Sequence, residues 1–292
     1  MKKIAAIAAA SLVALPLAAS AEITGGVGLS FGRISFEGSS DTLNNTRLDF
    51  DLNYNTGNAF GFAVNGSSSQ LSDGADDLTI NSLGGEAFYG FGNGYRAGAY
   101  FGTLSVSDFV GDNLSSYGLF FGTSGEGHSI DLSFGQLEAD GDTANEVSLR
   151  GTYDLSQGTS LSGEFSRAWD DGFNVNTFGI GAAHDLSEQA SVFGGLNVLS
   201  FDDGSDRLTT FSLGLAYDLA TISSFGATGW IELSHSSLNN TSDGINRVAF
   251  GISMPLGDAG AGAPVGSRSG SIGRGNRSGY SSLFSDGVFG AL

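Results

Sequence analysis

The chain contains no cysteine, and this absence excludes disulfide frameworks and thiolate metal sites. It is compatible with an oxidising envelope compartment, where a free thiol is a liability. Lysine occurs only as Lys2 and Lys3, so the remaining cationic side chains are 10 arginines, against 31 acidic residues. Nucleic-acid binding requires clustered Lys and Arg, so this acidic balance argues against nucleic acid as a partner.

Long apolar runs are also absent, except at the amino terminus. There Lys2 and Lys3 precede an apolar run over residues 4–17, and residues 18–21 are small. This order of regions is typical of a secretory signal peptide, and we expect cleavage after Ala21. Read as a membrane anchor, the run is interrupted by Pro16 and is shorter than the ~20 residues that cross a bilayer. Residues 1–21 are therefore predicted to be a signal peptide.

What the chain has in abundance is alternation of apolar and polar residues. Residues 47–54 read RLDFDLNY, and similar stretches recur about fourteen times between Glu22 and Gly257. Each such strand has one apolar and one polar face. In lipid every backbone N–H and C=O must be paired, so strands of this kind span a membrane only as a closed cylinder. The pattern predicts an all-β, antiparallel, up-and-down transmembrane β-barrel over residues 22–257.

The spacing of the tight turns predicts the number of strands. The residues that precede these turns are Tyr54, Phe91, Phe121, Tyr153, His184, Tyr217 and Met254. Their mean spacing of about 33 residues fits a hairpin of two ~10-residue strands with a short turn and a loop. Seven hairpins give fourteen strands, although twelve or sixteen also fit, because boundaries slip by several residues. We expect short periplasmic turns and acidic external loops, the longest from about Gly66 to Thr79.

The polar face of each strand supplies candidate pore-lining residues. A fourteen-strand barrel is wider than the eight-strand barrel that side chains fill, so we expect a water-filled lumen. By parity, the charged residues that face the lumen are Arg47, Asp49, Asp51, Glu86, Arg96, Asp131, Glu146, Arg150, Asp154, Glu164, Asp218, Glu232 and Arg247. Their excess of acid predicts a preference for cations. The alternative for any one of them is that it only pairs with a neighbour in a polar interior.

Residues 258–292 differ from the rest of the chain. They are rich in Gly, Ser and Arg, and they contain three arginines but only two acidic residues, Asp258 and Asp286. One interpretation is a flexible C-terminal extension. The other is that this tail contacts the acidic lumen or periplasmic cell-wall material.

Catalytic and metal-binding patterns are weak. Residues 140–146 carry carboxylates but lack the frame of a calcium loop, and a solvated acidic loop is the expected structure there. The three histidines lie scattered at strand ends, and no Gly-x-Ser-x-Gly elbow accompanies them. We therefore expect no enzyme activity, no metal site and no cofactor.

The leader, the opening residues 22–29 (EITGGVGL) and the hairpin over residues 47–62 resemble those of bacterial outer-membrane porins. The resemblance covers roughly residues 22–257 and implies an outer-membrane location, passive diffusion of ions and small hydrophilic solutes, contact with outer-membrane lipids, and frequent trimer formation. Two features depart from the porin pattern: no long constriction loop is evident, and the last strand does not end the chain at an aromatic residue. The rival hypotheses are a non-conducting structural or adhesive barrel and a soluble secreted β-protein.

Overall fold

The computed structural model describes residues 22–56, 59–74, 77–107, 114–139, 141–156, 158–172, 174–201, 206–221, 226–239, 244–257, 262–273 and 277. The predicted signal peptide, residues 1–21, lies outside the described residues. The strands are β1 (Glu22–Phe36), β2 (Thr42–Asn55), β3 (Phe60–Ser72), β4 (Asp77–Gly90), β5 (Tyr95–Val106), β6 (Leu114–Gly125), β7 (His128–Ala139), β8 (Asp142–Ser156), β9 (Thr159–Trp169), β10 (Asn174–Asp185), β11 (Ala190–Phe201), β12 (Asp206–Asp218), β13 (Thr228–Leu238) and β14 (Gly244–Leu256).

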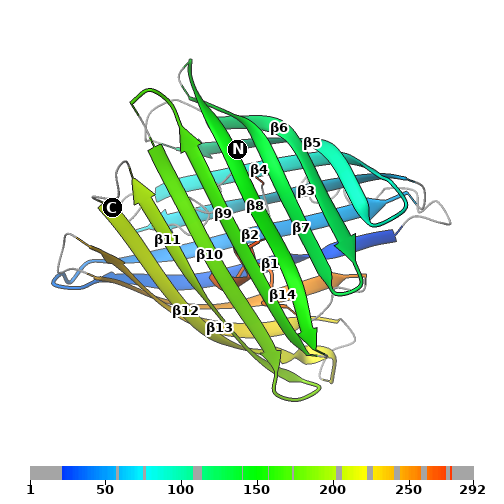
Figure 1. Cartoon of the computed structure of the whole chain (residues 1–292). Helices are drawn as coiled ribbons and strands as arrows, with labels where there is room; N and C mark the ends of the chain where they lie inside the picture. Colours follow the sequence, from blue (N-terminus) through cyan, green and yellow to red (C-terminus); the bar gives the residue numbers. More distant parts are fainter. Residues whose placement is uncertain are drawn as a thin grey trace, which may run out of the picture.

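These fourteen strands form one closed antiparallel barrel, as the alternation predicts (Figure 1). Each strand pairs with its neighbours in sequence, and β1 closes the barrel by pairing with β14, for example at Phe31 opposite Phe250. Every strand thus finds both of its partners within residues 22–257. The backbone hydrogen-bond network of the wall is complete without the rest of the chain.

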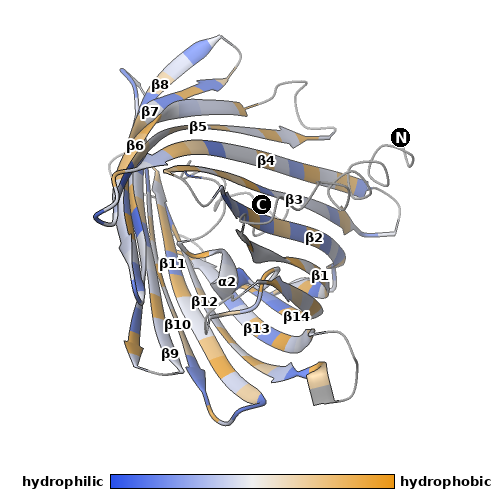
Figure 2. Cartoon of the chain, turned by 90° about the vertical axis from the view of Figure 1, so that its right-hand side faces the viewer, coloured by the Kyte–Doolittle hydropathy of each residue, from blue (hydrophilic) through white to orange (hydrophobic). Residues whose placement is uncertain are grey.

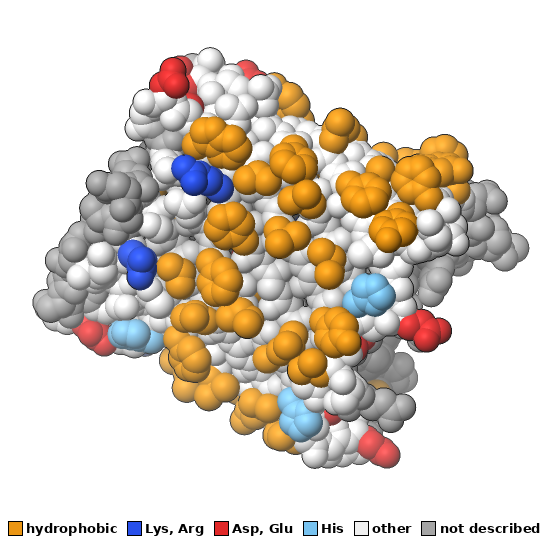
Figure 3. Space-filling model, viewed as in Figure 1, with side chains coloured by type: hydrophobic (Ala, Val, Ile, Leu, Met, Phe, Trp, Pro, Cys, Tyr) orange, Lys and Arg blue, Asp and Glu red, His pale blue; other side chains and the backbone are white. Residues whose placement is uncertain are grey.

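Apolar side chains cover the outer face of the wall. Phe134, Leu213 and Phe250 are more than half exposed, and the polar residues between them face inwards. Figure 3 shows apolar side chains spread over one side of the barrel, with acidic side chains near its margins. Such a surface is stable only when lipid or another apolar phase covers it. The outer face is therefore the membrane-facing surface.

Aromatic side chains gather near the end of the barrel with the periplasmic turns. Phe60 contacts Tyr89 with ring centroids 5.1 Å apart, Tyr89 contacts Phe91 at 5.3 Å, and Tyr95 stacks on Phe121 at 5.8 Å. Aromatic girdles of this kind mark the interface between membrane and water.

The strands are longer than expected, and this corrects the prediction for the external loops. Strands β3 and β4 continue to Ser72 and from Asp77, so most of the proposed loop between Gly66 and Thr79 is paired sheet. Other acidic residues expected in external loops also lie in strands: Glu138 is in β7, and Asp142 and Glu146 are in β8. The prediction was wrong because runs of Ser, Asn and Gly resemble loops, whereas in a barrel they also form the polar inner face of strands.

Two short helical segments accompany the strands: the 3-10 turn η2 (Leu219–Thr221) and the helix α2 (Arg268–Ser271). Within the described part of the chain, no helix is long and apolar enough to cross a membrane. Figure 2 shows α2 inside the barrel, against the inner face of β11 and β12. The described residues of the C-terminal tail, 262–273 and 277, thus lie in the lumen.

Candidate functional site

The charged residues predicted to line the pore lie mostly on the inner face of the wall. Those buried or half-buried there are Arg47, Asp49, Asp51, Glu86, Arg96, Asp131, Glu146, Arg150, Glu164, Glu232 and Arg247. Two others lie at the periplasmic ends of their strands, where Asp154 is exposed and Asp218 accepts a hydrogen bond from the backbone N–H of Ala220. The alternation along a strand determines whether a side chain faces the lumen or the lipid. How far it lies from the end of the barrel depends on where the strand ends.

Four of these residues form a charge cluster: Glu86 on β4, Arg96 on β5, Asp131 on β7 and Arg150 on β8. Arg150 Nη2 lies 2.8 Å from Glu86 Oε1, and Arg96 makes two hydrogen bonds to Asp131, of 3.0 and 2.6 Å. Arg150 Nε lies 4.0 Å from Asp131 Oδ2. Strands β4 and β8 are four steps apart, about 19 Å along the sheet, so the first pair bridges the concave lumen. The cluster narrows the water-filled section on this side of the barrel.

Two further pairs lie elsewhere on the inner wall. On β2, Arg47 Nε donates to both carboxylate oxygens of Asp49 at 2.8 Å. Arg247 Nη1 on β14 lies 3.4 Å from Glu232 Oε1 on β13. Both pairs join residues on the same or neighbouring strands. They therefore neutralise charges locally on the inner wall and do not bridge the lumen.

The tail adds a fifth member to the charge cluster. Arg277 Nη2 donates to Glu86 Oε2 at 2.7 Å, and its Nη1 lies 3.3 Å from Asp131 Oδ2. The guanidinium also lies 3.4 Å from the centre of the Phe120 ring, within the range of a cation–π contact. Burial and then repulsion from Arg150 lower the pKa of Arg277 to about 10, so it remains charged at neutral pH.

A second contact holds the tail on the opposite wall. Glu232 accepts hydrogen bonds from the backbone N–H groups of Arg268 at 3.0 Å and Ser269 at 3.1 Å, and from Ser269 Oγ at 3.0 Å. Ser269 Oγ also lies 2.8 Å from Ser212 Oγ on β12. A carboxylate that receives several hydrogen bonds in a buried site binds its donors more strongly than a neutral acceptor does. Glu232 is therefore the principal acceptor for the α2 segment.

Apolar contacts between tail and wall use inward-facing glycines. Ile272 is 2% exposed and packs over Gly179 and Gly195, where an added Cβ would lie 3.2 and 2.6 Å from its side chain. At Gly28 on β1, an added Cβ would overlap the carbonyl oxygen of Val265. A larger residue at Gly28 would displace the backbone of the tail, whereas at Gly179 and Gly195 the side chain of Ile272 would have to shift.

A cavity of about 1090 Å³ remains between the tail and the periplasmic turns. Its acidic lining residues are Asp51, Glu86, Asp131, Asp185, Glu188 and Asp218, and its arginines are Arg96, Arg150 and Arg277. The volume holds many water molecules, and it is continuous with the charge cluster. The lumen is therefore a wet, acidic vestibule at its periplasmic side.

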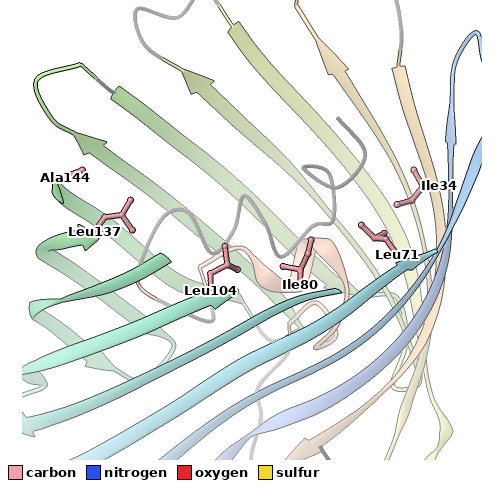
Figure 4. Close-up of a cluster of buried hydrophobic side chains, with 6 residues drawn as sticks. All are labelled: Ile34, Leu71, Ile80, Leu104, Leu137 and Ala144. Atoms are coloured by element: carbon pink, nitrogen blue, oxygen red, sulfur yellow. The ribbon is translucent and has the colours of Figure 1, made fainter. Parts of the chain in front are cut away.

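The opposite end of the lumen is apolar. Ile34, Leu71, Ile80, Leu104, Leu137 and Ala144 form one buried cluster there (Figure 4). With their packed neighbours and a second cluster around Val175, Leu199 and Leu208, every strand contributes at least one apolar residue. We call this set the apolar ring; its members are Ile34, Phe36, Leu43, Leu71, Leu78, Ile80, Leu104, Val106, Leu114, Leu137, Ala144, Ala168, Val175, Leu199, Phe201, Leu208, Leu238 and Ile245.

No protein-family model and no curated protein sequence matches this chain. Solved structures do match. An anion-selective porin from Comamonas acidovorans is 13% identical, with a TM-score of 0.51, over 81% of this chain and 99% of that chain. A Pseudomonas aeruginosa FadL homologue is 10% identical, also with a TM-score of 0.51, over 81% of this chain and 90% of that chain. The fold is that of a bacterial outer-membrane porin.

This porin-type barrel has an apolar outer face that is stable only under lipid or another apolar phase. Sequence reasoning found its charged lining and left two interpretations of the tail, a flexible extension or a segment that contacts the acidic lumen or cell-wall material. It assigned no individual wall partner to Arg268, Ser269, Ile272 or Arg277. A signal was present, since inward positions of several strands carry glycine, as at Gly28, where a chain can approach the wall closely.

Proposed function

We propose that the protein is an outer-membrane channel for ions and small hydrophilic solutes. The observation that carries this proposal is the cavity of about 1090 Å³ inside a closed transmembrane barrel, lined by charged side chains. A barrel whose only role was structural would have no need of a polar vestibule. Polar lumens of this kind conduct in porins, whereas smaller barrels are filled by side chains.

We further propose that the channel prefers cations. Six carboxylates line the vestibule against three arginines, one of which, Arg277, belongs to the tail. Rings of acidic side chains raise the local concentration of cations and repel anions. When the tail is absent, the lining keeps its six acids and loses that arginine, so the preference should increase.

The test is conductance of the refolded barrel in a planar lipid bilayer under a salt gradient. The chain that ends after Gly257 keeps all fourteen strands and their pairing, so it isolates the lumen from the tail. Discrete steps with a cation-selective reversal potential are expected. A barrel that inserts, resists protease and stays silent would overturn the proposal.

A matched pair of variants tests the charge assignment. Asp51→Asn removes a vestibule carboxylate, and the reversal potential should move toward the non-selective value. Asp41→Asn removes an exposed acid between β1 and β2, outside the cavity, and should leave the potential unchanged. Equal effects of the two would mean that net charge, and not the vestibule, controls selectivity.

One observation favours a second candidate, a barrel that does not conduct. The tail lies across the lumen and is bound on two sides. If the truncated chain were also silent, this structural or adhesive role would replace the channel. The identity of the solute and the trimer implied by the resemblance to porins stay predictions, and cross-linking in membranes would test the trimer.

A further inference from the structure

We propose that the C-terminal tail, through its described residues 262–273 and Arg277, is a tethered plug of this lumen, bound along the charged wall. The proposal rests on the channel function above, since a plug has meaning only in a pore.

Charge complementarity supports the proposal. The tail carries three of the ten arginines that follow the leader, and the two described ones, Arg268 and Arg277, are 4% and 3% exposed. Arg277 binds Glu86 and Asp131, while the backbone of Arg268 binds Glu232. Carboxylates from opposite walls thus bind one segment. A random extension would not place each donor against a buried acid.

Shape complementarity supports it independently. Wall glycines lie where the tail approaches most closely, at Gly28 beneath Val265 and at Gly179 and Gly195 beneath Ile272. Gly273 adopts a φ of +73° and its N–H donates to Glu164 at 3.1 Å. The inner face of the wall is therefore fitted to this segment along several strands.

A disulfide lock tests the plug in the full-length chain. Ser212 Oγ and Ser269 Oγ are 2.8 Å apart, and the chain has no native cysteine, so Ser212→Cys with Ser269→Cys should form one bond between wall and tail. Oxidised, this variant should show no opening steps. Reduction should restore the openings of the unmodified full-length chain, which are expected to be fewer and smaller than those of the chain ending after Gly257.

The matched control is Ser67→Cys with Ser82→Cys, whose hydroxyl oxygens are also 2.8 Å apart but join β3 to β4. Its openings should not respond to oxidation or reduction. If the oxidised tail lock conducts as well as the chain ending after Gly257, the plug is refuted while the channel stands. If all chains are silent, the channel itself fails.

Discussion

Arg277 Nη2 lies 2.7 Å from Glu86 Oε2, although 191 residues separate them in the chain. The contact joins the tail to a wall position that alternation had assigned to the pore. Glu86 also binds Arg150 Nη2 at 2.8 Å, so one carboxylate holds both the wall and the tail. The proposed selectivity and the proposed closure of the lumen therefore depend on the same residue.

Arg277→Gln should loosen the tail and increase cation preference. The change removes the positive charge that lies on Glu86 and Asp131, while Arg150 and Arg96 still partner these acids, so the wall stays folded. More frequent openings and a larger cation-selective reversal potential are expected in bilayer recordings of the full-length chain. Arg33→Gln, at an exposed site bonded to Thr42, is the control and should change neither quantity.

Gly28→Ala should release the tail without altering it. The added methyl group would overlap the carbonyl oxygen of Val265, which must move away from β1. Trypsin should then cleave at Arg268 or Arg277, which are buried in the native chain, and mass spectrometry would detect the fragments. Gly172→Ala has open space around the new methyl group and should stay resistant. Equal resistance of both variants would mean that the wall tolerates the methyl group.

Glu232→Gln should weaken the docking of α2. Its fully buried carboxylate accepts hydrogen bonds from Arg268 and Ser269, and an amide would turn a donor group toward one of them. The loss should be about 1–3 kcal/mol in the stability of the tail-docked state. This loss would be measured as a lower temperature at which the folded barrel changes its migration on a gel. Asp218→Asn, at a periplasmic turn, should leave the transition within about 0.5 kcal/mol of wild type.

Phe134→Arg should impair insertion into the membrane. Phe134 is 58% exposed at the middle of β7, on the outer face. An arginine at the bilayer midplane costs about 2–4 kcal/mol in the folding free energy of a barrel, and about 0–1 near the interface. Urea titration in lipid vesicles should therefore show a large loss for this variant and a small one for Gln136→Arg, nearer the strand end. Similar losses of folding free energy in the two variants would mean that Phe134 does not lie at the bilayer midplane.

The barrel was predictable because alternation is a local property of each strand. The parity of residues 47–54 assigns Arg47 and Asp49 to the lumen and Leu48 to lipid, and the structure agrees. Loop lengths were less predictable, because the inner face of a barrel strand accepts the same Ser, Asn and Gly that form loops, as in residues 66–72 of β3.

The contents of the lumen were not predictable in the same way. The contact of Arg277 with Glu86 joins distant segments, and no periodicity encodes such a pairing. The apolar ring was also missed. Its members, such as Leu71 and Leu104, lie near strand ends, where the alternation was taken to stop, and inward apolar residues contradict the expectation of a uniformly polar lumen.

The central claim is a conducting lumen closed by the protein's own tail. The most direct measurement is the single-channel conductance of residues 22–292 carrying Ser212→Cys and Ser269→Cys, recorded before and after oxidation joins the tail to β12. We predict cation-selective openings that oxidation abolishes and reduction restores. Openings of unchanged size and frequency in the oxidised state would contradict the account.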